Sequence, residues 1–168
     1  MTTQTDFPTE FDYIIVGGGA AGCVLANRLS ARSNLRVALI EAGGPDNTPR
    51  IHVPAGTISL YKSQKYTYQY YSTPQTHLDN RRIHVPRGRM LGGSSSMNSM
   101  IYIRGARSDY DHWESLGCTG WGYDSVLKYF MREEDNRLHQ DPQFHGTGGE
   151  LIVDQPRDPL DVSRLFIK

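Results

Sequence analysis

Residues 11–41 read FDYIIVGGGAAGCVLANRLSARSNLRVALIE, and this stretch decides the fold. Its apolar run at 13–16 is too short to cross a membrane and too unbroken for a half-exposed strand, so it predicts a buried parallel strand. A second apolar run at 35–40 predicts another strand. Between the two runs, apolar side chains recur at the spacing of one helix face. The stretch is therefore expected to form a strand–helix–strand unit.

Three glycines follow the first strand in the spacing G-x-G-x-x-G, at Gly17, Gly19 and Gly22. The first allows a tight turn, the second lets backbone approach a pyrophosphate, and the third lets helix and strand pack closely. The helix N-terminus then offers free N–H groups to phosphates. Glu41, at the end of the second strand, can accept hydrogen bonds from a ribose diol and would repel a 2′-phosphate, which disfavours NADP. This context favours dinucleotide binding over a structural turn, but does not separate NAD from FAD.

Composition narrows the class of protein. The 168 residues suit about one domain. Because 18 basic residues balance 18 acidic ones, no nucleic-acid surface is indicated. Cys23 and Cys118 have no CxxC partner, which argues against disulfide and metal frameworks and suits a reducing compartment. The N-terminus shows no secretory signal, no segment suggests a membrane span, and a cytoplasmic protein is expected.

A second informative stretch covers residues 86–105, PRGRMLGGSSSMNSMIYIRG. Its glycines and serines form a loop of small residues that can approach a flat or phosphorylated ligand closely. Three nearby cations, Arg87, Arg89 and Arg104, could balance a pyrophosphate charge. By composition alone, a plain turn is the alternative interpretation.

The rest of the chain carries weaker signals. Residues 47–82 look like loops, apart from a short strand on which Tyr66, Tyr68 and Tyr70 alternate. The six histidines are scattered, and each is expected to be structural or solvated. The other expected elements are a helix with a capping box at 108–111, a helix capped by Asp124 or Ser125 and running to Glu134, a strand at 150–153 and a helix from 158 onward.

Taken together, the motifs resemble the glucose-methanol-choline (GMC) family of flavin oxidoreductases, in particular its choline and alcohol dehydrogenase branch. The resemblance is carried by DYIIVGGGAAGCVLANRLS, ALIEAGGPD, HVPRGRMLGGSSSMNSMIYIRG, DYDHWESLGCTGWGYDSVLKYF and FHGTGGELIV. It implies an α/β fold, namely a Rossmann-like FAD-binding domain that is incomplete and carries loop-rich insertions and extra helices.

The resemblance also implies a division of the chain. Residues 1–168 would be the N-terminal portion of a GMC FAD-binding domain, and the substrate domain would be absent. Within this portion, residues 11–41 would be the dinucleotide-binding βαβ unit and residues 86–111 the flavin-contacting signature. Residues 112–168 would supply helices and the start of the next segment.

The cofactor implied by the resemblance is FAD. Tyr68 takes the place that tryptophan usually holds in the segment covering the flavin. Some relatives attach FAD covalently through a histidine at the place of Met97, and because a thioether cannot form that bond, FAD is expected to be non-covalent. The cofactor-binding residues implied are Gly17, Gly19, Ala20, Ala21, Gly22, Glu41, Ala42, Arg89, Gly93, Ser94, Asn98, Met100 and Ile101.

The implied activity is oxidation of the CH–OH group of an alcohol, choline or another primary alcohol, by hydride transfer to the flavin. The electron acceptor would be neither NAD nor oxygen. The family's catalytic histidine lies near the far C-terminus, and no histidine of this chain falls in that motif, so no catalytic or metal-binding residue is assigned. The alternatives are an inactive truncated fragment, a module needing a partner chain, or an FAD oxidase or lyase of the same fold.

Overall fold

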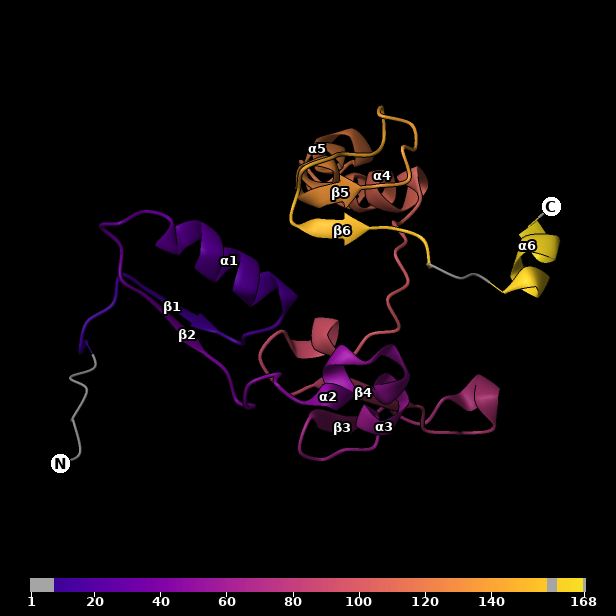
Figure 1. Ribbon diagram of the computed structural model, residues 1–168, viewed down its shortest axis with the longest axis horizontal. Coiled ribbons are helices and arrows are strands. Elements are labelled where there is room, and N and C mark those ends of the chain that lie inside the picture. Colours follow the sequence, from indigo (N-terminus) through magenta and orange to yellow (C-terminus); the bar gives the residue numbers. More distant parts are fainter. Residues whose placement is uncertain (1–7, 157–159, 168) are drawn as a thin grey trace. The chain divides into compact units, whose positions relative to one another are not determined.

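The computed structural model describes residues 8–156 and 160–167. The chain divides into two compact units, Met1–Ile101 and Tyr102–Lys168, which Figure 1 shows in ribbon form. This division falls inside the predicted flavin-contacting signature at 86–111. Among the described residues, no helix has both the length and the apolar character needed to cross a membrane.

The first unit begins with the predicted strand–helix–strand arrangement. Strand β1 (Tyr13–Val16) and strand β2 (Val37–Ile40) pair in parallel, and helix α1 (Ala20–Ser30) connects them and packs on both. The register places Tyr13 opposite Val37 and Val16 opposite Ile40. The predicted order and the parallel pairing are confirmed.

The prediction that the first strand is buried is wrong for the part of the chain that the structure describes. Ile14 and Val16 are 61% and 83% exposed, whereas Ile15 is partly buried beside Gly22 of α1. Side chains alternate along a strand, so only one face of this two-stranded sheet is covered by the helix. The other face carries the exposed apolar side chains.

The rest of the first unit is more regular than the expected loop at 47–82. A hairpin pairs β3 (Thr67–Tyr71) with β4 (His84–Gly88) in antiparallel register. The expected loop also holds four short helices, and a fifth follows the hairpin. In chain order these helices are α2 (Pro49–His52), η1 (Pro54–Gly56), α3 (Thr57–Leu60), η2 (Thr76–Leu78) and η3 (Gly93–Ser96). A core of buried apolar side chains, Leu60, Met90 and Met97, joins α3 to the segment after β4.

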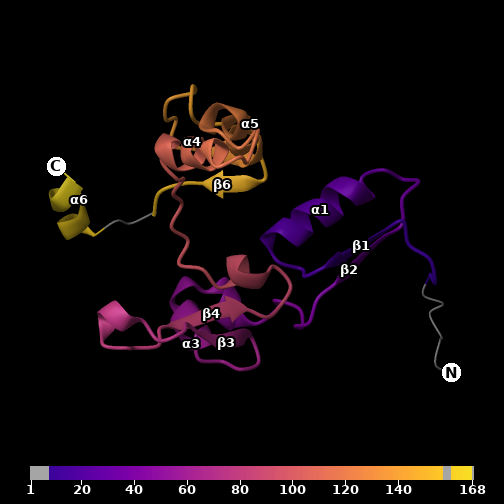
Figure 2. The same ribbon diagram turned by 180° about the vertical axis from the view of Figure 1, so that it is seen from behind.

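The second unit pairs two helices with a small parallel sheet, as Figure 2 shows from behind. Helices α4 (Arg107–Ser115) and α5 (Tyr123–Glu133) pack together, and β5 (Glu134–Asn136) pairs with β6 (Leu151–Val153). Helix α6 (Asp161–Ile167) follows. The predicted start of this last helix, at 158, lies outside the described residues.

The starts of α4 and α5 differ from the predicted caps. Helix α4 has Ala106 as its N-cap, two residues before the expected box, and the Asp109 carboxylate accepts the Ala106 N–H at 2.7 Å. Helix α5 has Gly122 as its N-cap, and Asp124 instead binds Arg107 through two hydrogen bonds of 2.8 and 2.9 Å. The predicted helix end at Glu134 is the first residue of β5, because this carboxylate is drawn into a buried polar cluster.

Candidate functional site

A pocket of about 410 Å³ lies at the carboxyl ends of β1 and β2, which is where ligands bind in open α/β sheets. Its walls come from three places in the sequence: the turn before α1, the end of β2 and the segment around β3, β4 and η3. The lining residues are Val16, Gly17, Gly19, Ile40, Glu41, Ala42, Tyr68, Gly88, Gly93 and Ser94.

The turn between β1 and α1 owes its shape to glycine. Gly17 has φ +100°, in the region that favours glycine, and its N–H donates to the Ile40 carbonyl at 2.7 Å. A side chain at Gly22 would overlap the Gly17 carbonyl, so the helix packs tightly on the turn. Helix α1 has no side-chain N-cap and no acid in its first turn. Its first N–H groups are therefore available to an anion.

The second glycine-rich loop lies directly against this turn. The Gly92 N–H donates to the Gly18 carbonyl at 2.7 Å, and Gly19 and Gly92 form a parallel bridge. A Cβ atom on Gly93 would lie 2.8 Å from the Cα of Gly19, so the two backbones cross without room for a side chain. Two motifs that are far apart in the sequence thus form one pocket.

Glu41 is held by backbone groups on both sides. Its Oε2 accepts the Gly18 N–H at 2.7 Å, and its Oε1 accepts the Gly43 N–H at 2.8 Å. The side chain belongs to the pocket wall and is partly buried. These two bonds fix the direction in which the carboxylate faces.

The third wall of the pocket includes the ring of Tyr68, which contacts a second tyrosine and a cation. Tyr68 lines the pocket and stacks on Tyr70 with ring centroids 5.4 Å apart, which confirms that these tyrosines share one face of a strand. The Arg89 guanidinium carbon lies 5.7 Å from the Tyr68 ring centroid, within the range of a cation–π contact. Arg89 is exposed and does not itself line the pocket.

The structure gathers some of the predicted cofactor residues and leaves others apart. The pocket holds Gly17, Gly19, Glu41, Ala42, Gly93 and Ser94. The remaining ones in the first motif, Ala20, Ala21 and Gly22, belong to the first turn of α1. Asn98 and Met100 line a separate pocket of about 260 Å³ that also includes Asp46 and His52. Ile101 is 80% exposed.

Sequence reasoning overlooked two glycines that shape the site. Gly43 holds Glu41, and Gly88 lines the pocket beside Gly93. A side chain on Gly88 would overlap the Gly93 carbonyl. The dipeptide Gly43-Gly44, two residues after Glu41, was the available signal for the first, although it also fits a simple strand end.

Met97 points away from the surface. It is 4% exposed and packs in the core with Leu60 and Met90. Met97 therefore has a structural role in this chain.

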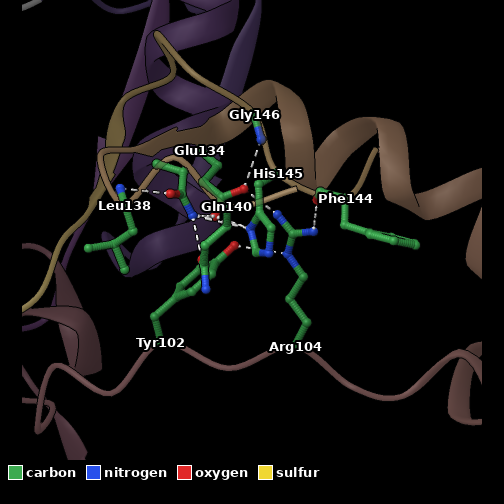
Figure 3. Close-up of polar contacts among 9 residues, drawn as sticks. Tyr102, Arg104, Glu134, Leu138, Gln140, Phe144, His145 and Gly146 are labelled. Carbon is green, nitrogen blue, oxygen red and sulfur yellow. Dashed lines mark hydrogen bonds and ion pairs between the residues drawn. The ribbon is translucent and has the colours of Figure 1, made fainter. Parts of the chain in front are cut away.

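The second unit contains a separate buried polar cluster, drawn in Figure 3. Glu134 is fully buried, and both carboxylate oxygens are occupied. Its Oε1 lies 2.9 Å from His145 Nδ1 and 3.1 Å from Asn136 Nδ2. Its Oε2 lies 2.5 Å from Arg104 Nη2 and 3.0 Å from the Gly146 N–H. Because an ionised carboxylate only accepts, Nδ1 of His145 carries the hydrogen in this contact.

Burial alone raises the pKa of the Glu134 carboxyl, since water is removed from the charge. The hydrogen bonds from His145, Asn136 and Gly146 and the charge of Arg104 outweigh burial, so the pKa lies below its usual value. Arg104 also donates to the Phe144 carbonyl and, at 2.9 Å, to the Tyr102 hydroxyl. Because both carboxylate oxygens of Glu134 are paired, the cluster stabilises the second unit. Among the described residues, no group of three His, Cys, Asp or Glu side chains could hold a metal ion.

The family model for GMC oxidoreductases matches residues 11–167. The chain belongs to the GMC oxidoreductase family. It is 46% identical to the alcohol dehydrogenase [acceptor] of Pseudomonas putida over 158 residues, 94% of this chain and 29% of that protein. It is 47% identical to the oxygen-dependent choline dehydrogenase of Photobacterium profundum over 143 residues, 85% of this chain and 25% of that protein.

Solved structures show the same fold. The pyridoxine 4-oxidase of Mesorbium loti superimposes with a TM-score of 0.84 at 40% identity, over 94% of this chain and 31% of that one. An FAD-dependent oxidoreductase of Chaetomium thermophilum gives 0.77 at 30% identity, over 92% and 28%. The chain spans less than a third of the length of these proteins, and the matched part corresponds to the GMC FAD-binding N-terminal domain.

Proposed function

We propose that this chain forms the cofactor-binding part of an FAD-dependent oxidoreductase that oxidises the CH–OH group of an alcohol. The observation that carries the proposal is the single pocket built by two glycine-rich loops with Glu41 in its wall. The family membership favours a flavin over a nicotinamide cofactor. In this proposal the strand–helix–strand unit is Rossmann-like, and residues 86–111 supply the flavin-facing segment.

The described residues fit FAD. The uncapped N-terminus of α1 and the open space beside Gly19 suit the diphosphate. Glu41, already oriented by two backbone N–H groups, suits the adenosine ribose diol. Gly93 and Ser94 leave room for the flavin end, next to the ring of Tyr68.

The flavin is proposed to be non-covalent. Met97 stands where some relatives have the attaching histidine, and it is buried in the core. None of the six histidines, all of which lie in the described residues, lines the glycine-loop pocket.

Bound FAD would accept the hydride that leaves the alcohol carbon. The contribution of this chain is to bind and orient that cofactor, and we propose that the base taking the hydroxyl proton is not one of its six histidines. The alcohol would be choline or another primary alcohol, since two relatives of this chain are named alcohol dehydrogenase and choline dehydrogenase. The likeness to a pyridoxine 4-oxidase favours a second candidate, an FAD oxidase of the same fold.

Replacement of Glu41 tests the cofactor assignment. Glu41→Ala removes the ribose acceptor and both N–H contacts, so the FAD affinity of the 168-residue chain should fall by about tenfold or more. The measurement is a titration followed by flavin fluorescence, with riboflavin, which lacks the adenosine, as the control ligand. Equal FAD affinity in both proteins would show that the ribose assignment is wrong.

Acid precipitation of the flavin-loaded chain tests the mode of attachment. All of the flavin absorbance should move into the supernatant, because no side chain that can bond to the flavin stands at position 97. Yellow colour that stays with the precipitated protein would contradict non-covalent binding.

A further inference from the structure

We propose that Gly43 is a positioning residue that fixes the Glu41 carboxylate for a vicinal diol, and that the segment after β4 keeps Gly43 in place. The inference rests on the proposed function, because it assigns the diol to the adenosine ribose of the cofactor. It adds a residue outside the glycine motif to the part of the site that recognises adenosine.

The Glu41 carboxylate can accept more hydrogen bonds than its two backbone contacts use. An ionised carboxylate has about four lone-pair sites. In this structure the Gly18 N–H takes one on Oε2 and the Gly43 N–H takes one on Oε1. One site remains on each oxygen, which matches two adjacent hydroxyl groups. A ligand with one hydroxyl would leave one of these sites unused.

Gly43 can hold this place only without a side chain. A Cβ atom there would overlap the Arg89 carbonyl and lie 2.5 Å from the Met90 nitrogen. The same segment reaches the other donor, since the Gly92 N–H binds the Gly18 carbonyl at 2.7 Å. Residues 89–92 therefore lie against both glycines whose N–H groups hold Glu41.

The segment is itself anchored. Met90 is fully buried and packs with Leu60 and Met97, which ties the segment to the core of the first unit. The orientation of Glu41 thus depends on a segment that belongs to the second sequence motif. It follows that a ligand's 2′-hydroxyl is recognised through contacts between the two motifs.

The test compares ADP with 2′-deoxy-ADP, each titrated into the 168-residue chain and followed by NMR. Unsubstituted protein should bind ADP about tenfold or more tightly than the deoxy compound, the effect of one hydrogen bond to a charged group. Gly43→Ala should remove this preference. Gly44→Ala is the matched control, because a Cβ atom there meets nothing within 4 Å, and it should keep the preference.

The outcomes separate the two proposals. A preference for ADP that survives in Gly43→Ala would overturn the role of Gly43 and leave the FAD assignment standing. If the chain binds neither FAD nor ADP, the proposed function fails. The two contacts that position Glu41 can also be tested without a ligand. The amide proton resonances of Gly18 and Gly43 should move upfield in Glu41→Gln, because the charged acceptor is lost. Amide resonances that do not move would overturn the inference, whether or not Gly43→Ala folds.

Discussion

At the scale of single residues, the site depends on positions that must remain without a side chain. Gly93 combines two such demands. Its φ of +57° is unfavourable for other residues, and a Cβ atom would press on Gly19. The residue is thus fixed both by its own backbone and by that of the other loop.

Gly93→Ala should therefore destabilise the first unit by about 1–3 kcal/mol through overpacking and reduce flavin content. Thermal unfolding and the flavin absorbance of the purified chain measure the two effects. Gly120→Ala is the control, because Gly120 also has a positive φ, +85°, but its Cβ position is open. If both substitutions lower stability equally and both retain flavin, the crossing of the two loops contributes nothing beyond backbone strain.

At the scale of elements, the junction of α5 and β5 is held by a buried charge. Glu134 gains four polar contacts there and loses all contact with water. Breaking a buried pair by neutralising one partner typically costs about 3–5 kcal/mol. Within the second unit, this carboxylate therefore connects the start of β5 to Arg104 and to the loop residues His145 and Gly146.

This dependence predicts a pH effect. The folded-state pKa of Glu134 is depressed below its ordinary value of 4.5. Its contribution is thus complete above about pH 4.5 and is lost as the pH falls through the lower folded value. Urea unfolding of the chain and of Glu134→Gln should show a stability difference at pH 7 that shrinks towards pH 3. A stability difference that stays constant with pH would contradict this prediction. Asp124→Asn is the control: it changes an exposed ion pair with Arg107 and should have little effect on the stability at pH 7.

The elements differ in how far the sequence predicts them. The Gly17-x-Gly19-x-x-Gly22 spacing and the apolar runs determine the first unit's strand–helix–strand order, because that pattern is local. The caps at Ala106 and Gly122 were missed, since a carboxylate at Asp109 or Asp124 can serve a cap or bind a cation. The close approach of Gly93 to Gly19 and the burial of Glu134 depend on contacts distant in sequence, which no local pattern specifies.

At the scale of the whole molecule, the net charge of zero is the sum of a positive first unit and a negative second unit. Residues 1–101 carry ten Lys or Arg and six Asp or Glu, whereas residues 102–168 carry eight and twelve. The glycine-loop pocket belongs to the positive unit, and FAD is an anion because of its diphosphate. Long-range attraction should therefore assist its capture.

The association rate of FAD should fall several-fold between 10 mM and 1 M ionic strength, over which the Debye length shrinks from about 30 to 3 Å. Stopped-flow quenching of flavin fluorescence measures this rate. Riboflavin is uncharged and should show little dependence. The same salt response for both ligands would mean that the charge of the first unit plays no part in cofactor capture.

The crossing of Gly19 and Gly93 also bears on the order of folding. Contacts between distant parts of a chain cost closure entropy before they return any stabilisation, so they form late compared with the local turn before α1. The pocket exists only after that closure. A flavin that binds there meets an already folded unit, and its stabilisation appears mainly as slower unfolding, with little gain in the speed of folding.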